Sequence, residues 1–309
     1  MQHTSAMQAE TKQPNSSRKS LAPLFTALLI LAMVIWGGSW VSAKVVAGRL
    51  SPEVLSFWRF FLSFLSFIPL LLCLRTPLVL TKNEFGHCFM AAVFMAAYMF
   101  SFFKGLQRGY AGAGGVLVTS MIPLMTLLLS LIILKRKLRR RDISGLILGL
   151  CGASIILKLW AVDYALLLRS GNIFFLVCPV LWGMVTISSQ RAGSTLSPFL
   201  FSFAAYGIAS VLYLPLALRE VGDVLHQDAV FWWNLFFLAV VSGSFATTVY
   251  FIAAEKLGSY RTSSFVFLVP SSAMLLSWLF LAETPDAGTI IGGTIAVSAV
   301  YVINKPAPS

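Results

Sequence analysis

The stretch WGGSWVSAKVVAGRLSPEVLSF, residues 36–57, is followed 146 residues later by WGMVTISSQRAGSTLSPFLFSF, residues 182–203. The two stretches share Trp-Gly at their start, then Leu-Ser-Pro, then Ser-Phe at their end, at the same relative positions. A row of matches in order at nearly constant spacing indicates a chain built from two related halves. Further matches continue the row: Pro69-Leu70 with Pro215-Leu216 at the same offset and, with one added residue, Pro123 with Pro270 and Gly145 with Gly292.

Hydrophobic residues make up 58% of the 309 residues and charged residues 11%, against about 45–50% and about 25% in soluble domains. So much apolar surface excludes a soluble globular enzyme, a disordered chain and a coiled coil. A membrane-spanning helix needs about 20 mostly apolar residues. We therefore predict an all-α polytopic membrane protein with ten transmembrane helices joined by short connections. The ten predicted spans are 22–43, 54–74, 86–104, 112–134, 143–160, 171–190, 198–218, 231–254, 262–282 and 286–304.

Each half contains five spans, and because five is odd the second half enters the membrane from the opposite side. The halves are therefore predicted to be inverted repeats, related by a pseudo-two-fold axis in the membrane plane. Inverted repeats are typical of secondary transporters, which open a midplane site to each side in turn. Some channels share this construction, so a pore stays open as an alternative. The expected boundaries are an N-terminal tail at 1–20, a first repeat at 21–160, a second, inverted repeat at 161–304 and a tail at 305–309.

The formal net charge of +12 comes mainly from basic residues in the connections, where such residues set membrane orientation. Most of them fall on the side that holds the N-terminus, which predicts cytoplasmic N- and C-termini in a bacterial inner membrane or plasma membrane. The apolar stretch from Leu21 to about Ala43 is too long for a signal peptide and is interpreted as an uncleaved span. The basic cluster Lys135–Arg141 is either a topology anchor or a site for anionic lipid headgroups. Nucleic acid is not expected as a partner.

The sequence lacks a Gly-rich phosphate loop ending in Gly-Lys-Ser/Thr, and it lacks the His-Glu-x-x-His and Gly-x-Ser-x-Gly signatures of hydrolases. The four cysteines (Cys73, Cys88, Cys151 and Cys178) do not stand at metal-ligand spacing. We therefore expect neither enzymatic activity nor ATP-driven pumping, and no metal or cofactor.

Several predicted helices carry short sequence motifs. They are Trp36-Gly37-Gly38-Ser39-Trp40 on the first helix, Ser51-Pro52 and Trp58-Arg59-Phe60 at the second, Ile122-Pro123-Leu124 on the fourth and Val269-Pro270 on the ninth. In order and spacing these motifs resemble the EamA-type branch of the drug/metabolite transporter superfamily, the ten-helix exporters, over about residues 21–304. The resemblance implies export of small metabolites, often amino acids or related compounds, without ATP.

The chain departs from that family at one point. Its ninth helix ends in Leu281-Ala282-Glu283-Thr284, similar to the family's Gly-Glu turn, nine residues before Gly292. In the first half Arg136 stands at the matching place before Gly145. The role that this carboxylate has in relatives therefore cannot be filled twice in this chain.

Polar and aromatic residues inside spans are candidates for a solute site. Trp36, Ser39 and Trp40 share one face of the first helix. Trp182 and Thr186 repeat the pattern on the sixth helix, the symmetry mate of the first. These faces are predicted to oppose each other across a cavity, where tryptophan stacks on a solute and donates a hydrogen bond. Interfacial anchoring or simple packing is the alternative.

Other spans add further candidates. Arg59 either faces inward and attracts a carboxylate or snorkels outward. Pro123 and Pro270 each free a backbone carbonyl one turn earlier and are predicted to be hinges, with a static kink as the alternative. No acidic residue lies deep in a predicted span, which leaves facilitated export, exchange and proton antiport open. The remaining substrate-binding candidates, whose hydroxyls could equally serve helix packing, are Tyr98, Phe102, Thr119, Thr248, Phe251 and Ser264.

The patterns Gly145-x-x-x-Gly149 and Gly288-x-x-x-Gly292 allow close helix approach and predict scaffold packing or a homodimer. The leading prediction is a secondary transporter that exports small metabolites by alternating access. An exchanger of phosphorylated or nucleotide-linked solutes is the second reading, and it needs several inward basic residues where the sequence offers Arg59. A channel or a non-transporting membrane scaffold is the alternative of another class.

Overall fold

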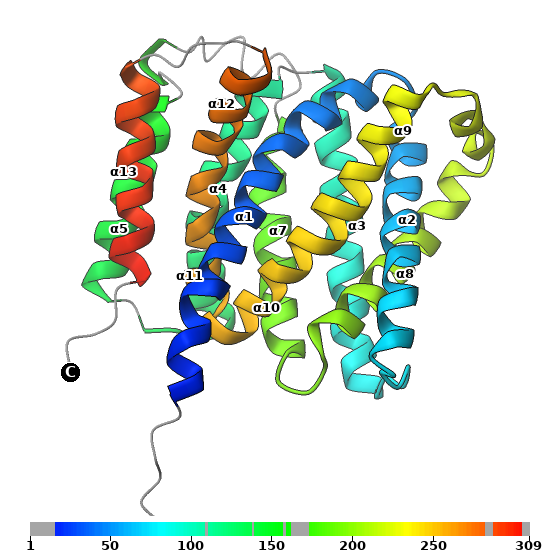
Figure 1. Cartoon of the computed structure of the whole chain (residues 1–309), viewed down its shortest axis with the longest axis horizontal. Helices are drawn as coiled ribbons and strands as arrows, with labels where there is room; N and C mark the ends of the chain where they lie inside the picture. Colours follow the sequence, from blue (N-terminus) through cyan, green and yellow to red (C-terminus); the bar gives the residue numbers. More distant parts are fainter. Residues whose placement is uncertain are drawn as a thin grey trace, which may run out of the picture.

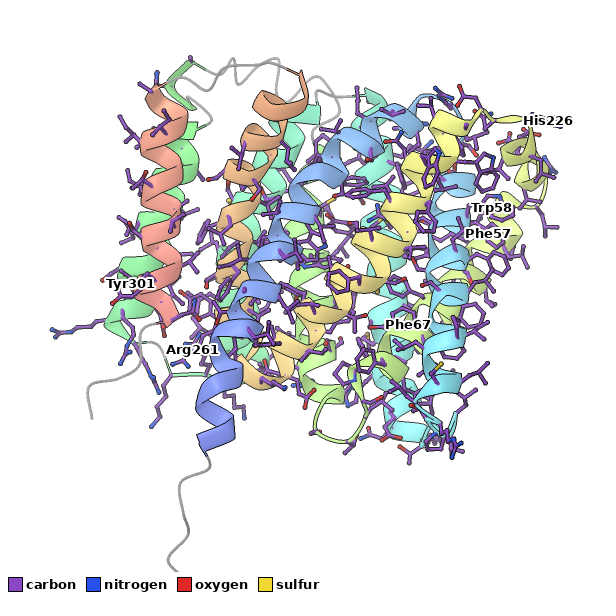
Figure 2. All side chains as sticks on the ribbon, viewed as in Figure 1. Phe57, Trp58, Phe67, His226, Arg261 and Tyr301 are labelled. Atoms are coloured by element: carbon purple, nitrogen blue, oxygen red, sulfur yellow. The ribbon has the colours of Figure 1, made fainter. Side chains whose placement is uncertain are left out.

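The computed structural model describes residues 16–108, 111–137, 139–156, 159–161, 173–281 and 287–304, and within these ranges the regular structure is helical. The helices pack side by side in one bundle (Figure 1), and side chains fill the spaces between them (Figure 2). The first half contains α1 (Ser16–Ala47), α2 (Pro52–Cys73), α3 (Lys82–Arg108), α4 (Ala111–Ile133), α5 (Arg140–Ile156) and the short turn η1 (Leu159–Ala161). The second half contains α7 (Ile173–Ala192), α8 (Pro198–Ala217), η2 (Val221–His226), α9 (Ala229–Phe236), η3 (Phe237–Ala246), α10 (Thr247–Leu257), α11 (Ser259–Ser264), η4 (Phe265–Phe267), α12 (Leu268–Leu281) and α13 (Ala287–Asn304).

Several of these helices have the length and composition of membrane spans. Among the described residues, the five helices that are long and apolar enough to cross a membrane are Leu24–Ala47, Pro52–Cys73, Lys82–Arg108, Pro198–Ala217 and Ala229–Leu257. Shorter apolar helices run over Val118–Ile133 and Ile290–Asn304. Together these helices confirm the prediction of an all-α membrane protein.

The two halves run through the bundle in opposite directions. α1 begins at one edge of the bundle, whereas its counterpart α7 begins at the opposite edge (Figure 1). The contacts between helices show the same relation when each helix is replaced by its counterpart. α3 packs on α7, and its counterpart η3 packs on α1. α4 packs on α7, and its counterpart α12 packs on α1. α2 packs on its own counterpart α8, and α5 on its own counterpart α13. These contacts confirm the inverted repeat. The edge where α1 begins is called the N-terminal edge below, and the other the far edge.

The repeated Leu-Ser-Pro tripeptide is a signal for starting a helix. Ser51 and Ser197 both have an extended backbone, with φ −63° and ψ 149° in the first and φ −64° and ψ 141° in the second. Pro52 and Pro198 then take the first helical position. Proline suits this position because its φ is preset and a backbone N–H there would have no partner within the helix. The tripeptide thus fixes the residues at which α2 and α8 begin. These two helices pack on each other.

The eighth span, expected at 231–254, is not one regular α-helix, because η3 is a ten-residue π-helix. The offset between the two halves grows from 146 to 147 residues between Pro215 and Pro270, and η3 lies in this interval. A π-helix bonds residue i to i+5, so it accommodates an extra residue within a span. Two hydroxyls from neighbouring helices bind its backbone: Ser63 Oγ donates to Ala239 O at 2.7 Å, and Tyr206 Oη donates to Gly243 O at 2.6 Å.

Small residues bring α5 and α13 into close contact. A Cβ atom added at Gly152 would lie 2.7 Å from the carbonyl oxygen of Gly292 and 2.9 Å from the amide nitrogen of Ala296. One added at Gly145 would collide with Ile303. The glycine pattern on these helices therefore serves packing within one chain, which is the scaffold role, while a homodimer stays a prediction.

We expect Gly152→Val to destabilise the protein by about 1–3 kcal/mol, the usual cost of forcing extra atoms into a packed interface. The side chain would have to push α13 away at the backbone of Gly292. Gly86→Ala on α3 is the matched control, since nothing lies within 4 Å of a Cβ at that position. Thermal unfolding of the purified variants in detergent measures the difference. Equal melting temperatures for the two variants would show that α5 and α13 do not pack in this way.

Candidate solute-binding site

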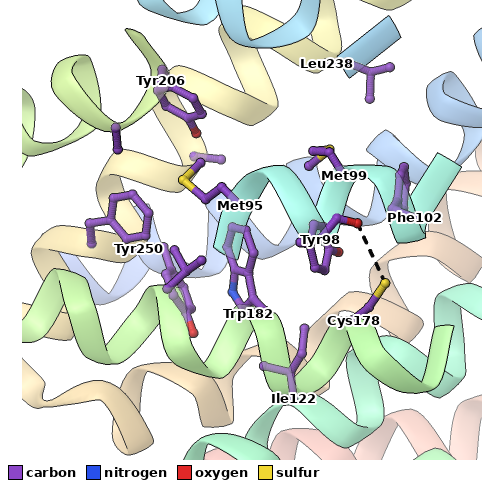
Figure 3. Close-up of a cluster of buried hydrophobic side chains, with 14 of the residues drawn as sticks. Met95, Tyr98, Met99, Phe102, Ile122, Cys178, Trp182, Tyr206, Leu238 and Tyr250 are labelled. Carbon is purple, nitrogen blue, oxygen red and sulfur yellow. Dashed lines mark hydrogen bonds between the residues drawn. The ribbon is translucent and has the colours of Figure 1, made fainter. Parts of the chain in front are cut away.

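A buried cavity lies at the centre of the bundle, between the two halves. Several of its side chains appear in Figure 3, including Trp182, Tyr98 and Met95. The space open to the centre of a water-sized sphere is about 50 Å³, whereas one ordered water needs about 10–15 Å³ on this measure. The cavity as it stands therefore has room for a few waters and not for a solute of amino-acid size. Its lining residues are Trp36, Ser39, Trp40, Arg59, Phe60, Met95, Tyr98, Met99, Phe102, Thr119, Ile122, Trp182, Tyr206, Ser242, Thr247, Val266 and Val269.

The lining residues are related to one another by the internal repeat. Counterparts at an offset of 146 or 147 residues meet at the same cavity from opposite halves. The cavity therefore surrounds the pseudo-two-fold axis, where a site can be presented to either side by equivalent movements. The counterpart pairs are Trp36 with Trp182, Phe60 with Tyr206, Met95 with Ser242, Thr119 with Val266, and Ile122 with Val269.

Arg59 gives the cavity its positive charge. The residue is 8% exposed and lines the cavity, so it points inward and does not snorkel outward. Within the described part of the chain no carboxylate oxygen lies within 4.0 Å of its guanidinium. Its counterpart in the second half is Ala205, so the charge breaks the two-fold symmetry. A buried cation without an anionic partner favours binding of an anionic group, because the pairing offsets its desolvation.

Two further polar groups at the cavity lack a hydrogen-bond partner in the described part of the chain. Trp182 Nε1 and Ser242 Oγ are both buried and make no hydrogen bond with described residues. A buried donor without a partner costs about 1–3 kcal/mol, which a bound water or solute oxygen would relieve. The described residues contain no group of three His, Cys, Asp or Glu side chains placed to hold a metal ion.

An aromatic cluster closes the cavity toward the N-terminal edge. The ring centroids of Trp36 and Trp182 lie 5.2 Å apart, and those of Trp36 and Tyr250 lie 5.0 Å apart. Tyr98 adds a contact with Trp182 at 5.1 Å. Thr186 fixes the cluster, because its hydroxyl lies 3.1 Å from the Tyr250 hydroxyl. We call Trp36, Trp182, Tyr250 and Thr186 the inner closure.

A second group of rings closes the cavity toward the far edge. Trp40, one turn further along α1 than Trp36, has its ring centroid 4.9 Å from that of Phe102. Phe175 at the start of α7 lies 6.4 Å from the same indole. We call Trp40, Phe102 and Phe175 the outer closure. Aromatic rings therefore flank the narrow cavity on both sides.

The two prolines stand next to the cavity but in different local structure. Pro123 lies inside α4, and Thr119, one turn earlier, lines the cavity. Pro270 is the third residue of α12 and follows the 3₁₀ turn η4. Val266, one turn before it, also lines the cavity. Because proline cannot donate to the residue four positions earlier, the helical bonding is interrupted at the cavity wall in both halves.

The structure separates the predicted site residues into two groups. Eight line the cavity: Trp36, Ser39, Trp40, Arg59, Tyr98, Phe102, Thr119 and Trp182. The other four, Thr186, Thr248, Phe251 and Ser264, do not. Thr248 instead donates to Ser202 Oγ at 3.0 Å, and Ser264 Oγ accepts from Asn304 Nδ2 at 3.0 Å. Phe251 is fully buried in the core. In this structure these side chains join helices to one another and do not line the central cavity. Their part in solute binding stays a prediction.

The sequence analysis also missed lining residues: Phe60, Met95, Met99, Ile122, Tyr206, Ser242, Thr247, Val266 and Val269. For some of them the signal was present in the repeat. Val266 is the counterpart of the predicted Thr119. Met95 and Met99 carry no such mark, because an apolar residue in a span looks the same whether it faces a cavity, another helix or lipid.

Comparisons with known proteins agree with this architecture. A crystal structure of another protein superposes with a TM-score of 0.73, covering 91% of this chain and 97% of that one at 18% identity. Among curated proteins, an uncharacterized transporter of Archaeoglobus fulgidus is 24% identical, with 89% of this chain and 95% of that protein covered. The uncharacterized transporter YoaV of Bacillus subtilis is 23% identical, covering 89% and 94%. A protein of Rickettsia bellii named S-adenosylmethionine uptake transporter is 22% identical, covering 89% and 91%.

The EamA-like transporter family matches the chain twice, over residues 24–158 and again over residues 169–305. The two matches correspond to the two inverted halves, and together they span most of the chain. These relatives are named as transporters, one of them for S-adenosylmethionine, which indicates a small molecule as the transported solute. This chain therefore belongs to the EamA-like transporter family, of the drug/metabolite transporter type, and is an integral membrane transporter.

Proposed function

We propose that this transporter exports small metabolites, amino acids or related compounds, by alternating access across a bacterial inner membrane or plasma membrane. Both termini are then cytoplasmic, and the N-terminal edge of the bundle is the cytoplasmic edge. The observation that carries the proposal is the narrow central cavity between the two halves, with an arginine in its wall that has no carboxylate partner among the described residues.

The size of the cavity supports alternating access. With room for a few waters, it admits a solute only if one of its closures opens. The inner and outer closures share no residue, and Tyr98 links them, with its ring centroid 5.1 Å from that of Trp182 and 5.9 Å from that of Phe102. Alternating access requires the rings of one closure to part while those of the other stay in contact. Pro123 and the 3₁₀ turn before Pro270 interrupt helical bonding beside the cavity in both halves, which makes them the proposed hinges for this movement.

The chemistry of the wall favours a solute with a carboxylate and a flat or apolar remainder. Arg59 binds the carboxylate through charge-assisted hydrogen bonds, and the tryptophan rings stack on the remainder. Trp182 Nε1 and Ser242 Oγ offer hydrogen bonds to further polar atoms. One cation matches a carboxylate better than a phosphate dianion, which ranks the exchanger of phosphorylated solutes lower. S-adenosylmethionine, named for the Rickettsia relative, combines an amino-acid carboxylate with a flat base and belongs in the first set of solutes to test.

Counterflow in proteoliposomes tests the proposal. Vesicles loaded with an unlabelled amino acid, or with S-adenosylmethionine, receive a trace of the labelled compound outside, and protein-free vesicles provide the background. We expect saturable accumulation of label for at least one carboxylate-bearing solute. Flux that rises linearly without saturation would instead identify a channel, and absence of flux for every solute would identify a scaffold. Loading from either face of oriented vesicles then measures the direction of transport.

A further inference from the structure

A second, larger cavity opens at the N-terminal edge of the bundle, away from the central one. About 490 Å³ of it is open to the centre of a water-sized sphere. Its wall comes from the α4–α5 connection, the end of α7 and the turn between α10 and α11, so both halves of the chain build it. Arg261, labelled in Figure 2, belongs to this wall. The lining residues are Leu134, Arg136, Lys137, Arg139, Gln190, Leu257, Gly258, Ser259, Tyr260 and Arg261. We call this the basic pocket.

One cation of the basic pocket is held in a fixed position. Arg136 Nη2 lies 2.9 Å from Asp142 Oδ2, and its guanidinium stacks over the Tyr260 ring at 4.4 Å from the centroid. Tyr260 in turn donates its hydroxyl proton to the backbone carbonyl of Asp142 at 2.9 Å. Arg136 Nη1 is buried and makes no hydrogen bond with described residues. The arginine is therefore preorganised, and one of its donors has no partner among the described residues.

The other cations of the pocket form no ion pair with the part of the chain that the structure describes. Lys137, Arg139 and Arg261 have no ion-pair partner within the described residues. No Asp or Glu is among the lining residues, and the nearby Asp142 is already paired with Arg136. A cleft lined by charges of a single sign attracts ions of the opposite sign strongly, because its shape focuses the electric field. This pocket, lined by positive charges, therefore attracts anions.

The wall also has the rigidity that a binding site needs. The backbone N–H of Ser259 donates to Gln190 Oε1 at 2.8 Å, and Ser259 Oγ lies 3.1 Å from Ser130 Oγ. Gly258 turns the chain with φ +86°, a conformation that glycine adopts without strain. These contacts join α4, α7 and α11, so the elements that carry the wall are held together.

We propose that the basic pocket binds a phosphate group. Arginine forks bind phosphate oxygens in pairs, and three further cations offset the charge of a phosphate monoester or diester. Two sources carry this chemistry: the headgroup of an anionic lipid, or a soluble compound bearing phosphate. Basic residues that only orient the chain in the membrane need neither a cavity nor a guanidinium locked by Asp142 and Tyr260, and both are present here. The proposal does not rest on the transported solute, since the pocket is separate from the central cavity.

Thermal unfolding of the full-length purified protein tests this site in two arms. In the first, detergent-solubilised protein is titrated with inorganic pyrophosphate, with sodium chloride at matched ionic strength as reference. In the second, the protein is placed in nanodiscs of phosphatidylcholine with or without phosphatidylglycerol. We expect one of the two ligands to raise the melting temperature by about 3 °C at ten times its dissociation constant. A response to pyrophosphate identifies a soluble phosphate as the source, and a response to phosphatidylglycerol alone identifies a lipid headgroup.

Variants locate the effect. Arg261→Gln and the double variant Lys137→Gln/Arg139→Gln are expected to weaken binding about tenfold or more, the effect of one lost charged hydrogen bond. Lys82→Gln, which removes an exposed cation at the same edge, is the matched control and is expected to bind normally. Arg59→Gln also keeps the response, which separates this site from the transport site. If neither ligand stabilises the protein, or if the pocket variants respond as fully as Lys82→Gln, the proposal is overturned.

Discussion

Arg59→Gln is expected to lower the counterflow of carboxylate-bearing solutes by about 10- to 100-fold, the loss that corresponds to a charged hydrogen bond in a buried site. Arg59 is the cation of the central cavity, is 8% exposed, and has no carboxylate partner among the described residues. Glutamine keeps a hydrogen-bond donor and much of the volume but removes the charge. The variant should therefore discriminate between solutes, with the largest loss for those whose charge the arginine balances.

The comparison that decides this prediction is a neutral analogue, such as the amide of the same amino acid. The ratio of acid to amide transport should fall in Arg59→Gln and be retained in part by Arg59→Lys, which keeps a positive charge without the planar fork. Arg108→Gln serves as the control, since this exposed arginine lies at the end of α3. If acid and amide lose transport equally while the protein melts normally, Arg59 does not act on a carboxylate.

Trp182→Ala is expected to reduce transport about tenfold or more, with Trp36→Ala close behind. The indole of Trp182 contacts the rings of Trp36, Tyr98 and Tyr250 at centroid distances of 5.2, 5.1 and 6.0 Å. Each aromatic pair contributes about 0.5–1.5 kcal/mol beyond the area it buries. Removing the ring takes away both the surface on which a solute stacks and the centre of the inner closure, so binding and gating fail together.

Two companions separate these effects. Trp182→Phe keeps a ring but loses the Nε1 donor, and we expect it to transport at an intermediate rate. Trp233→Ala removes an equally large side chain that is 71% exposed on α9 and is expected to transport normally. Surface labelling confirms membrane expression, and melting temperature confirms folding. Wild-type counterflow in both Trp36→Ala and Trp182→Ala would show that the aromatic cavity does not bind the solute.

The internal repeat allowed the architecture to be predicted from sequence. One match of the repeat has a clear structural cause: at Ser51-Pro52 and Ser197-Pro198 both copies start a helix in the same backbone conformation. Once the two halves are recognised, each with an odd number of spans, it follows that one half is inverted relative to the other and that a site lies between them. The cavity face of α1 was predictable for the same reason, because helical spacing identifies which side chains share a face.

The eighth span differs from the prediction in its lining residues. Thr248 and Phe251 were the candidates from this span, whereas Ser242 and Thr247 line the cavity. These two residues are five apart, which is the repeat of the π-helix, and Thr247 Oγ1 donates to the carbonyl of Ser242 at 3.0 Å. A π-helix turns the following residues relative to an α-helix. Two of the hydroxyls that bind its backbone, those of Ser63 and Tyr206, belong to other helices, so the local sequence does not show these contacts.

The basic cluster gives a second example. In the sequence Lys135–Arg141 is one run of charge, but the structure distributes it. Arg136 faces Asp142 and Tyr260, while Lys137 and Arg139 join Arg261 from the other half of the chain in one wall. Charges more than a hundred residues apart in sequence meet because α4 ends, and α5 and α11 begin, at the same edge of the bundle.

The difference between Arg59 and its counterpart Ala205 has a consequence for how a solute would cross. In a fully symmetric carrier, a charged group would pass from a residue of one half to its equivalent in the other when access switches. Here the guanidinium belongs to α2 alone, so an amino acid would stay attached to the same helix throughout the crossing. Its carboxylate would act as a fixed pivot, and the rest of the molecule would exchange one set of surroundings for the other.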